Sequence, residues 1–183
     1  AYMTQGHDIN LDINRVVGYR NFCNKLWNAF KFATANLGAD FVAPTSLDVP
    51  QHATDVDRWI LHRLNASIVA VNEAFTTYDF GTATQALYGF WLYHFCDVYL
   101  EACKPTFRAG SPERRTATAT VIYLVLEVGL RLLHPFMPFL TEELWQRLPK
   151  PASAPVSIML AEYPTAVAQW DAPAVDTTIA AMN

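Results

Sequence analysis

The sequence predicts an all-α fold, an antiparallel helical bundle that ends in a short extended segment. Apolar residues recur at helical spacing in four long segments, and short turn-forming stretches separate these segments. The chain lacks the strand–helix–strand alternation of α/β proteins. Hydrophobic residues occupy 52% of the 183 positions, which is enough to bury a core. We therefore expect consecutive helices to pack together in opposite directions.

The first helix is expected from residue 14 to about residue 36, after a polar lead-in over residues 1–13. Asp12 or Asn14 can cap its first turn, because both side chains accept hydrogen bonds from helix N–H groups. Gly38 follows as a stop signal, since glycine readily ends a helix. A loop with two prolines then leads to the second helix.

Two more helices are expected in the middle of the chain. Thr54 caps the second helix, which has acids in its first turn and reaches about Thr77. Asp79 caps the third helix, whose wide apolar stripe indicates a central, buried position. Lys104 and Pro105 are expected to end it, because the residue before a proline disfavours helical backbone.

Two further helices are expected in the C-terminal third. The fourth begins at Ser111 and Pro112, a cap followed by proline at the first helical position, and runs to about His134. A short fifth helix is expected to be capped by Thr141 and to end near Leu148.

The chain is expected to divide into three parts. These are the lead-in over residues 1–13, the helical domain over 14–149 and a C-terminal part over 150–183. The last part begins as a Pro/Ala/Ser linker, continues as an extended segment over 157–163, and ends in the first turns of another helix after Trp170.

Several classes of chemistry lack their sequence signatures. The chain has no phosphate-binding glycine loop, no nucleophile elbow, no C-x-x-C and no H-E-x-x-H, so we expect neither catalytic residues nor a metal site. Three widely spaced cysteines do not form a disulfide framework. Asp97, Glu101 and Lys104 share a helix face, and a structural ion-pair cluster is favoured there over acid–base catalysis.

The first predicted helix has an unusual polar face. No acid occurs from Ile13 to Ala39, although the whole chain has a net charge of −4. At about 100° per residue, one arc of this helix combines cations, carboxamides and an aromatic ring, a surface suited to phosphates and unpaired bases. The competing interpretation is an ordinary solvated face with one packing aromatic. The polar arc contains Arg20, Asn21, Asn24, Lys25, Asn28, Lys31 and Phe32.

Blocks along the chain resemble the anticodon-binding domain of the valyl-tRNA synthetase family. The first helix of that domain resembles GYRNFCNKLWNAFKF, and the blocks DRWILHRLN, FCDVYLEACKP and LLHPFMPFLTEELWQRLP follow in the family's order. SIMLAEYP resembles its closing segment, and GHDINLD the stretch after the KMSKS loop. HPFMPFLTEELW also resembles leucyl and isoleucyl relatives, which stay open as an alternative. A helical protein-interaction module, marked by an exposed apolar groove on the third or fourth helix, is a second alternative.

The resemblance implies a binding module of a larger ligase that joins valine to its tRNA with ATP and Mg²⁺ and edits mischarged tRNA elsewhere. Because the HIGH and KMSKS motifs are absent, we expect this chain to be a non-catalytic piece that needs no cofactor itself. The expected partners are the tRNA(Val) anticodon stem-loop and the catalytic domain of the same protein, with neither a membrane nor DNA. No signal peptide or membrane-length apolar run is evident, which favours a cytoplasmic protein, and a mitochondrial form stays open.

The resemblance also implies a set of RNA contacts on the first helix. Lys25 matches a residue that contacts the anticodon, and Phe32 matches an aromatic that stacks there. A basic residue of the bacterial pattern falls on Asn14, so Arg15 beside it is the candidate substitute. The expected tRNA-binding residues are Lys25, Phe32, Arg20, Asn24, Asn28, Lys31 and Arg15.

Overall fold

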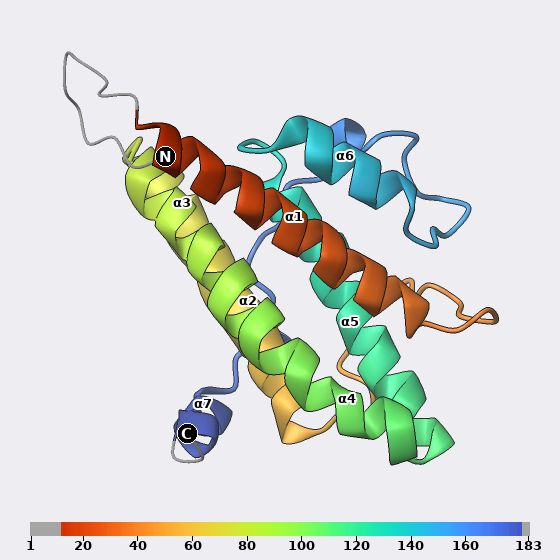
Figure 1. Cartoon of the computed structure of the whole chain (residues 1–183). Coiled ribbons are helices and arrows are strands. Elements are labelled where there is room, and N and C mark those ends of the chain that lie inside the picture. Colours follow the sequence, from red (N-terminus) through yellow and green to blue (C-terminus); the bar gives the residue numbers. More distant parts are fainter. Residues whose placement is uncertain (1–11, 181–183) are drawn as a thin grey trace.

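The computed structural model describes residues 12–180, apart from the side chains at positions 15, 177, 178 and 180. This range contains helices and loops and no strand, so the predicted all-α class is confirmed (Figure 1). Most of the predicted lead-in lies outside the described residues, and the division into three parts stays a prediction. The elements are α1 (Ile13–Ala35), α2 (Asp55–Thr76), α3 (Phe80–Gly89), the π-helical η1 (Phe90–Tyr99), α4 (Leu100–Ala109), α5 (Pro112–Leu133), α6 (Pro138–Gln146), the 3₁₀ turns η2 (Ile158–Leu160) and η3 (Ala168–Trp170), and α7 (Pro173–Ala180).

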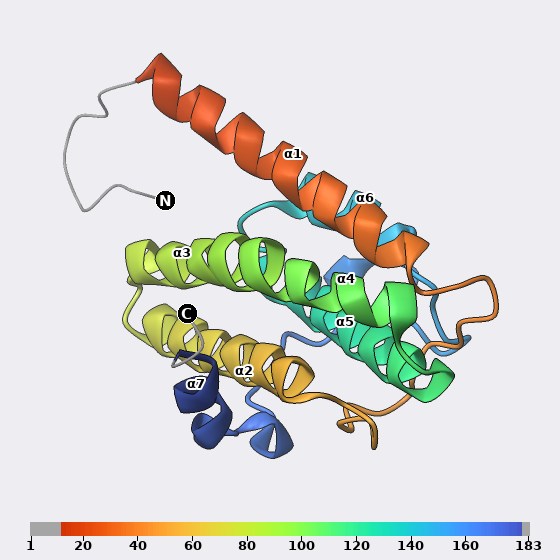
Figure 2. The same cartoon turned by 60° about the horizontal axis from the view of Figure 1, so that its bottom comes forward.

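The long helices alternate in direction along the chain, as predicted. Figure 1 shows α1 and the continuous α3–η1–α4 rod running in one direction, and α2 and α5 running in the other. The first and third long elements are therefore parallel neighbours. Figure 2 shows α1 at the outer edge of the bundle, where one of its sides is not covered by another helix.

Helix α5 lies at the centre of the core. It is long and apolar enough to cross a membrane by length and composition, but 78% of its most apolar window is buried inside the fold. Neighbouring helices surround its apolar side chains, which is typical of the core helix of a bundle.

The predicted N-caps of the first four expected helices are confirmed, including Asp79, whose side chain accepts from the Thr82 N–H at the start of α3. The Asp12 carboxylate accepts from the Asn14 N–H, and Ser111 accepts from Arg114 N–H. Thr54 and Asp57 form a reciprocal capping box at the start of α2. Gly38 has φ of 86°, a left-handed conformation that suits the end of a helix.

The predicted end of the third helix is wrong. The third helix does not stop at Lys104 but continues through Pro105 to Ala109. Tertiary packing outweighs the proline effect there, because the buried Cys103 and the partly buried Phe107 hold both sides of Pro105 against the core. The helix ends at Gly110, where a Cβ atom would lie 2.5 Å from the Thr106 carbonyl oxygen.

The start of the fifth predicted helix and the extended segment also differ from expectation. α6 begins at Pro138, and Thr141 lies fully buried inside it, where its hydroxyl donates to the Met137 carbonyl oxygen. Proline at the first helical position explains the earlier start. The segment 157–163 contains the 3₁₀ turn η2, which the Glu142 carboxylate holds by accepting from the Ile158 N–H.

Candidate nucleic-acid interface

A continuous exposed strip runs along the outer side of α1. We call it the polar strip, and it carries no acid. The side chain of Arg15, the remaining predicted contact on this helix, lies outside the described residues, although its backbone belongs to α1. The polar strip consists of Arg20, Asn21, Asn24, Asn28 and Lys31, all of which are exposed.

The opposite side of α1 packs into the bundle, as its apolar pattern predicts. Leu26, Phe30 and Ala33 are buried in the core. The Trp27 ring packs toward α6, where the Arg147 guanidinium carbon lies 5.2 Å from the ring centroid. These contacts fix the rotation of α1 about its axis, so the polar strip is held toward solvent.

Lys25 lies at the border of the polar strip, facing η1. Its Nζ donates a hydrogen bond to Oδ1 of Asp97 at 2.5 Å, and both side chains remain 44% exposed. This hydrogen bond raises the pKa of Lys25, so its ammonium group stays charged at neutral pH. The predicted anticodon contact is thus already paired with an acid in the absence of RNA.

Phe32 lies at the same border, about two helical turns further along α1. The sequence predicts an aromatic on the polar face, and the structure places it partly buried against the core. Lys104 Nζ lies 6.0 Å from the centroid of its ring, and this ammonium also donates to both carboxylate oxygens of Glu101 at 2.6 Å. Lys25 and Phe32, together with Asp97, Glu101 and Lys104 of the facing rod, form what we call the paired edge.

Aromatic rings continue the paired edge toward the start of α1. Phe22 stacks on Tyr88 with centroids 4.9 Å apart, and Tyr88 meets Tyr93 edge-on at 6.0 Å. Tyr93 is 56% exposed. An exposed aromatic ring can hold an unpaired base by stacking.

The π-helical stretch explains why the facing rod meets α1 along such a length. Nine residues separate Tyr88 from Asp97, and nine steps of about 100° would put them on opposite faces of an ideal α-helix. The wider π-helix of η1 rotates less per residue, which brings both side chains onto α1.

The sequence predicts an ion-pair cluster of Asp97, Glu101 and Lys104, and the structure confirms only its Glu101–Lys104 pair. The sequence does not predict the pairing of Asp97 with Lys25, because a 3.6-residue period cannot reveal the π register.

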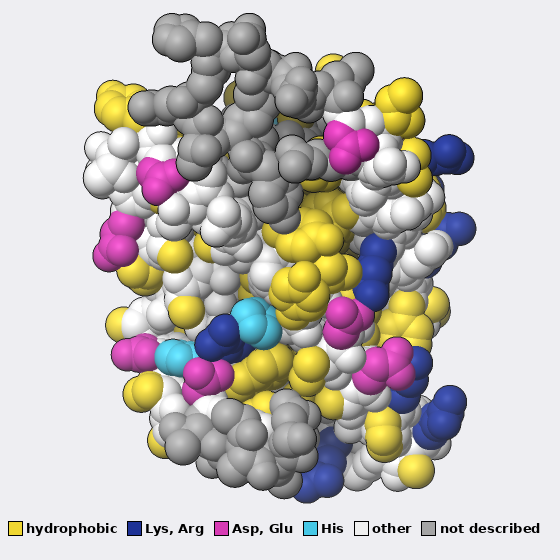
Figure 3. All heavy atoms as spheres, turned by 60° about the vertical axis from the view of Figure 1, so that its left-hand side comes forward, with side chains coloured by type: hydrophobic (Ala, Val, Ile, Leu, Met, Phe, Trp, Pro, Cys, Tyr) yellow, Lys and Arg dark blue, Asp and Glu magenta, His cyan; other side chains and the backbone are white. Residues whose placement is uncertain are grey.

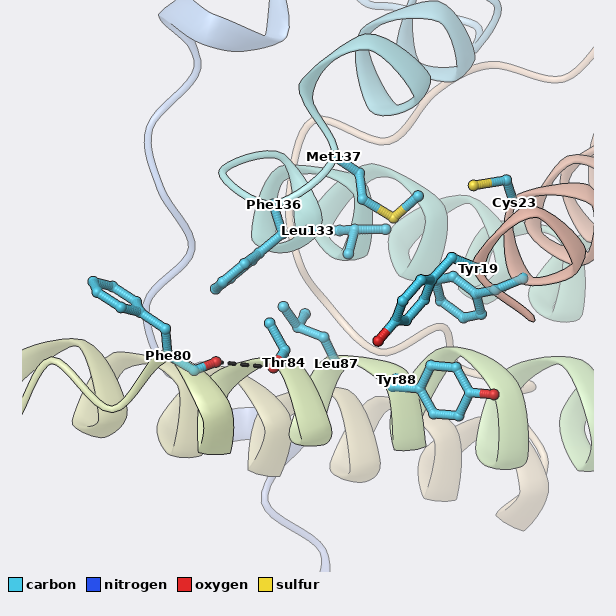
Figure 4. Close-up of a pocket in the computed structure, with 10 residues that line it drawn as sticks. Tyr19, Cys23, Phe80, Thr84, Leu87, Tyr88, Leu133, Phe136 and Met137 are labelled. Atoms are coloured by element: carbon cyan, nitrogen blue, oxygen red, sulfur yellow. Dashed lines mark hydrogen bonds between the residues drawn. The ribbon is translucent and has the colours of Figure 1, made fainter. Parts of the chain in front are cut away.

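An apolar cavity of about 520 Å³ lies between α1, α3 and the turn from α5 to α6, and Phe22 and Tyr88 form part of its lining. Figure 4 shows Tyr19 and Cys23 from α1 facing Leu87 of α3 and Met137 of the turn. Beyond the cavity, the first turns of α1 expose three more apolar residues, Ile13, Val16 and Val17. This end of the chain therefore presents apolar surface that other protein can cover.

A second group of polar residues joins α7 to α2 and η1. Figure 3 shows histidines next to both acidic and basic side chains on one face. Arg63 donates to Oδ2 of Asp176 at 3.2 Å and to Nε2 of His94 at 2.9 Å, and Trp59 Nε1 donates to Asp176 at 2.9 Å. Burial, assisted by Arg63, lowers the pKa of His94 to about 4. These contacts hold α7 in place, and no metal-binding group of side chains exists among the described residues.

Comparison with known proteins agrees with the helical architecture. The family described as "Anticodon-binding domain of tRNA ligase" matches residues 57–183. The chain belongs to this family. In the anticodon-binding domain described here, α1 precedes the matched range, but alignments with individual relatives include it.

Individual relatives confirm the resemblance to valine–tRNA ligases. The chain is 51% identical over 98% of its length to the valine–tRNA ligase of Takifugu rubripes and 52% identical over 90% to that of Mus musculus. It is 48% identical over 94% of its length to that of Geobacter sulfurreducens. The chain spans 15%, 13% and 19% of these three proteins. Relatives from Arabidopsis thaliana and Saccharomyces cerevisiae are named as mitochondrial forms, so the compartment stays open.

A solved structure matches the fold. It is the LeuRS of Agrobacterium radiobacter K84 in a ternary complex with tRNA and LeuAMS. The match has a TM-score of 0.61 at 20% identity and covers 90% of this chain and 18% of that one. At this identity the match supports the architecture alone.

Proposed function

We propose that this domain recognises the anticodon stem-loop of tRNA(Val) on behalf of a larger valine–tRNA ligase. The observation that carries the proposal is the acid-free polar strip, which α1 holds toward solvent in a chain that is acidic overall. Identity near 50% to valine–tRNA ligases supports valine as the amino acid. Joining valine to tRNA with ATP and Mg²⁺ would take place in parts of the protein outside this chain, and the domain itself supplies RNA binding.

The polar strip and the paired edge offer complementary contacts to a single-stranded loop. Arg20 and Lys31 can contact phosphates, which position the RNA without reading its sequence. Asn24 and Asn28 can reach base edges through both amide donors and carbonyl acceptors. Phe32 and Lys25, at the border, lie where an unstacked base can meet a ring and a cation together.

The apolar end is proposed to dock the remainder of the same ligase. The matched segment spans 13% to 19% of its relatives, which are therefore five to eight times longer. Most of such a protein lies outside this segment and is available to contact it. Ile13, Val16 and Val17 leave an apolar surface next to the cavity, and covering it with protein would be favourable. We therefore propose that this apolar surface contacts the rest of the ligase and not a separate protein partner.

A binding assay with matched variants tests the proposal. The chain is titrated against a fluorescent stem-loop with a valine anticodon and against one with a leucine anticodon, and anisotropy gives each Kd. Phe32→Leu keeps much of the packing but removes the aromatic face, so the Kd for the valine stem-loop should rise about 5- to 100-fold. Lys31→Ala should weaken the binding of both stem-loops and reduce its dependence on salt concentration.

Arg58→Ala is the matched control, because Arg58 is an exposed cation on α2, away from the polar strip. It should change neither Kd by more than about two-fold. Circular dichroism confirms that each variant keeps its helices. Equal affinity of the unaltered chain for both stem-loops, or variants of Phe32 and Lys31 that bind like the unaltered chain, would refute the proposed function or its site.

A further inference from the structure

We infer that the Lys25–Asp97 pair reads the amino edge of an anticodon base, which makes Asp97 a specificity-determining residue. The inference rests on the proposed function and assigns a role to an acid that lies beside the acid-free polar strip. A carboxylate there opposes RNA binding through repulsion of phosphates. Its presence needs a compensating interaction, and the geometry of the pair offers one.

The pair presents an acceptor and a donor side by side. Oδ1 of Asp97 accepts from Lys25, whereas Oδ2 accepts no hydrogen bond within the described part of the chain. The Lys25 ammonium has three N–H donors and uses one of them on Asp97. Both side chains are 44% exposed, so solvent and a ligand can reach the pair.

This donor–acceptor order matches two of the four bases. Adenine and cytosine carry an amino donor next to a ring nitrogen that accepts, whereas guanine and uracil carry a carbonyl acceptor next to a ring N–H donor. Asp97 Oδ2 would accept from the amino group, and Lys25 would donate to the neighbouring ring nitrogen. Guanine or uracil would place its carbonyl oxygen against the carboxylate, which is unfavourable.

The anticodon of the expected ligand contains both of these bases. Valine codons begin with GU, so every valine anticodon has adenine in the middle and cytosine at its 3′ position. The surroundings suit an unpaired base, since Tyr93 exposes its ring four residues before Asp97 on η1 and the polar strip lies on the other side of Lys25. The competing interpretation is a surface ion pair that merely anchors α1 to η1.

Two acids of the paired edge make a matched experiment. Asp97→Ala and Glu101→Ala each remove one exposed carboxylate that pairs with a lysine, and the two positions lie on the same rod. Each variant of the chain is titrated by anisotropy with the valine stem-loop, with a stem-loop whose middle adenine is guanine, and with one whose 3′ cytosine is uracil. The readout is the ratio of the Kd for an altered stem-loop to the Kd for the valine stem-loop.

We expect the unaltered chain to give a ratio of about ten or more at one of the two positions. Glu101→Ala should lower the Kd for all three stem-loops by a similar factor and leave the ratio unchanged. Asp97→Ala should reduce that ratio to within about two-fold of one. Lys25→Met, which keeps the aliphatic stem, should reduce the same ratio and provides a second route if one variant loses its helical circular dichroism.

The outcomes separate this inference from the function on which it rests. An unaltered chain that does not prefer the valine stem-loop overturns the proposed function. A chain that does prefer it, while Asp97→Ala and Glu101→Ala shift all three affinities alike, overturns the role of Asp97 alone.

Discussion

Substitution of Asp57 should strongly destabilise the fold, because this one buried carboxylate accepts hydrogen bonds from three helical elements. Its side chain is 1% exposed. It accepts from the Thr54 N–H at 2.9 Å and hydroxyl at 2.8 Å, from the Tyr99 hydroxyl at 2.6 Å and from the Thr118 hydroxyl at 3.2 Å. Asp57→Ala therefore removes half of the capping box on α2 and the acceptor for two hydroxyls on η1 and α5.

The cost can be assembled from these contacts. Loss of the cap costs about 1 kcal/mol. The Tyr99 hydroxyl is fully buried and would lose its acceptor, at about 1–3 kcal/mol, with a similar but smaller cost at Thr118. We expect Asp57→Ala to lower the free energy of unfolding by about 3–5 kcal/mol. Tyr99→Phe should lower it by about 1.5–3 kcal/mol, because within the described residues Oδ1 of the buried Asp57 carboxylate accepts only from this hydroxyl and would lose its partner.

Urea unfolding followed by circular dichroism measures both changes, and the double variant completes the cycle. The two losses should be sub-additive by about 1–2 kcal/mol, because removing the Tyr99 hydroxyl cancels part of the damage at Asp57. A loss below about 1 kcal/mol for Asp57→Ala, or strict additivity in the cycle, would refute the reasoning.

Three further predictions concern other buried groups. The pKa of His94 is lowered by burial to about 4 against an ordinary value of 6.5, so the unfolded chain binds the extra proton first as the pH falls. Unfolding free energy should drop by about 2 kcal/mol between pH 6.5 and pH 4, after allowance for partial exposure, and urea titrations should show a smaller drop for His94→Gln. Burial raises the pKa of the Cys96 thiol to about 12, so iodoacetamide at pH 8 should modify it in urea but not in the native chain, as mass spectrometry of peptides would show. Gly129→Ala should lower Tm, because the new Cβ would lie 2.9 Å from the Trp91 ring, whereas Gly18→Ala has no atom within 4 Å and should raise it.

The sequence predicts the helical elements well because their signals are local. The caps Thr54 and Ser111 act within one turn, so their positions follow from a few neighbouring residues. The predicted helix end at Pro105 and the predicted cap at Thr141 are wrong, because the helix bounds there depend on packing with segments distant in sequence. A local rule gives the intrinsic preference of the backbone, and burial against the core can outweigh it.

The candidate site was predicted in part for the same reason. The exposure of Arg20, Asn24 and Lys31 follows from the period of α1 alone. The contacts of Lys25 cannot be predicted from this period. Asp97 is 72 residues away and reaches α1 only through the π-helical register of η1.

The π-helical stretch has a consequence for comparing relatives. A protein of the same length that formed an ordinary α-helix over this stretch would turn more per residue than η1 does. Every side chain after the stretch would then face a different direction relative to those before it. Two aligned sequences with identical letters at Asp97 and Lys104 could therefore present different faces to α1. The helical register of the segment 90–99, rather than the identity of its residues, therefore decides which charges meet α1.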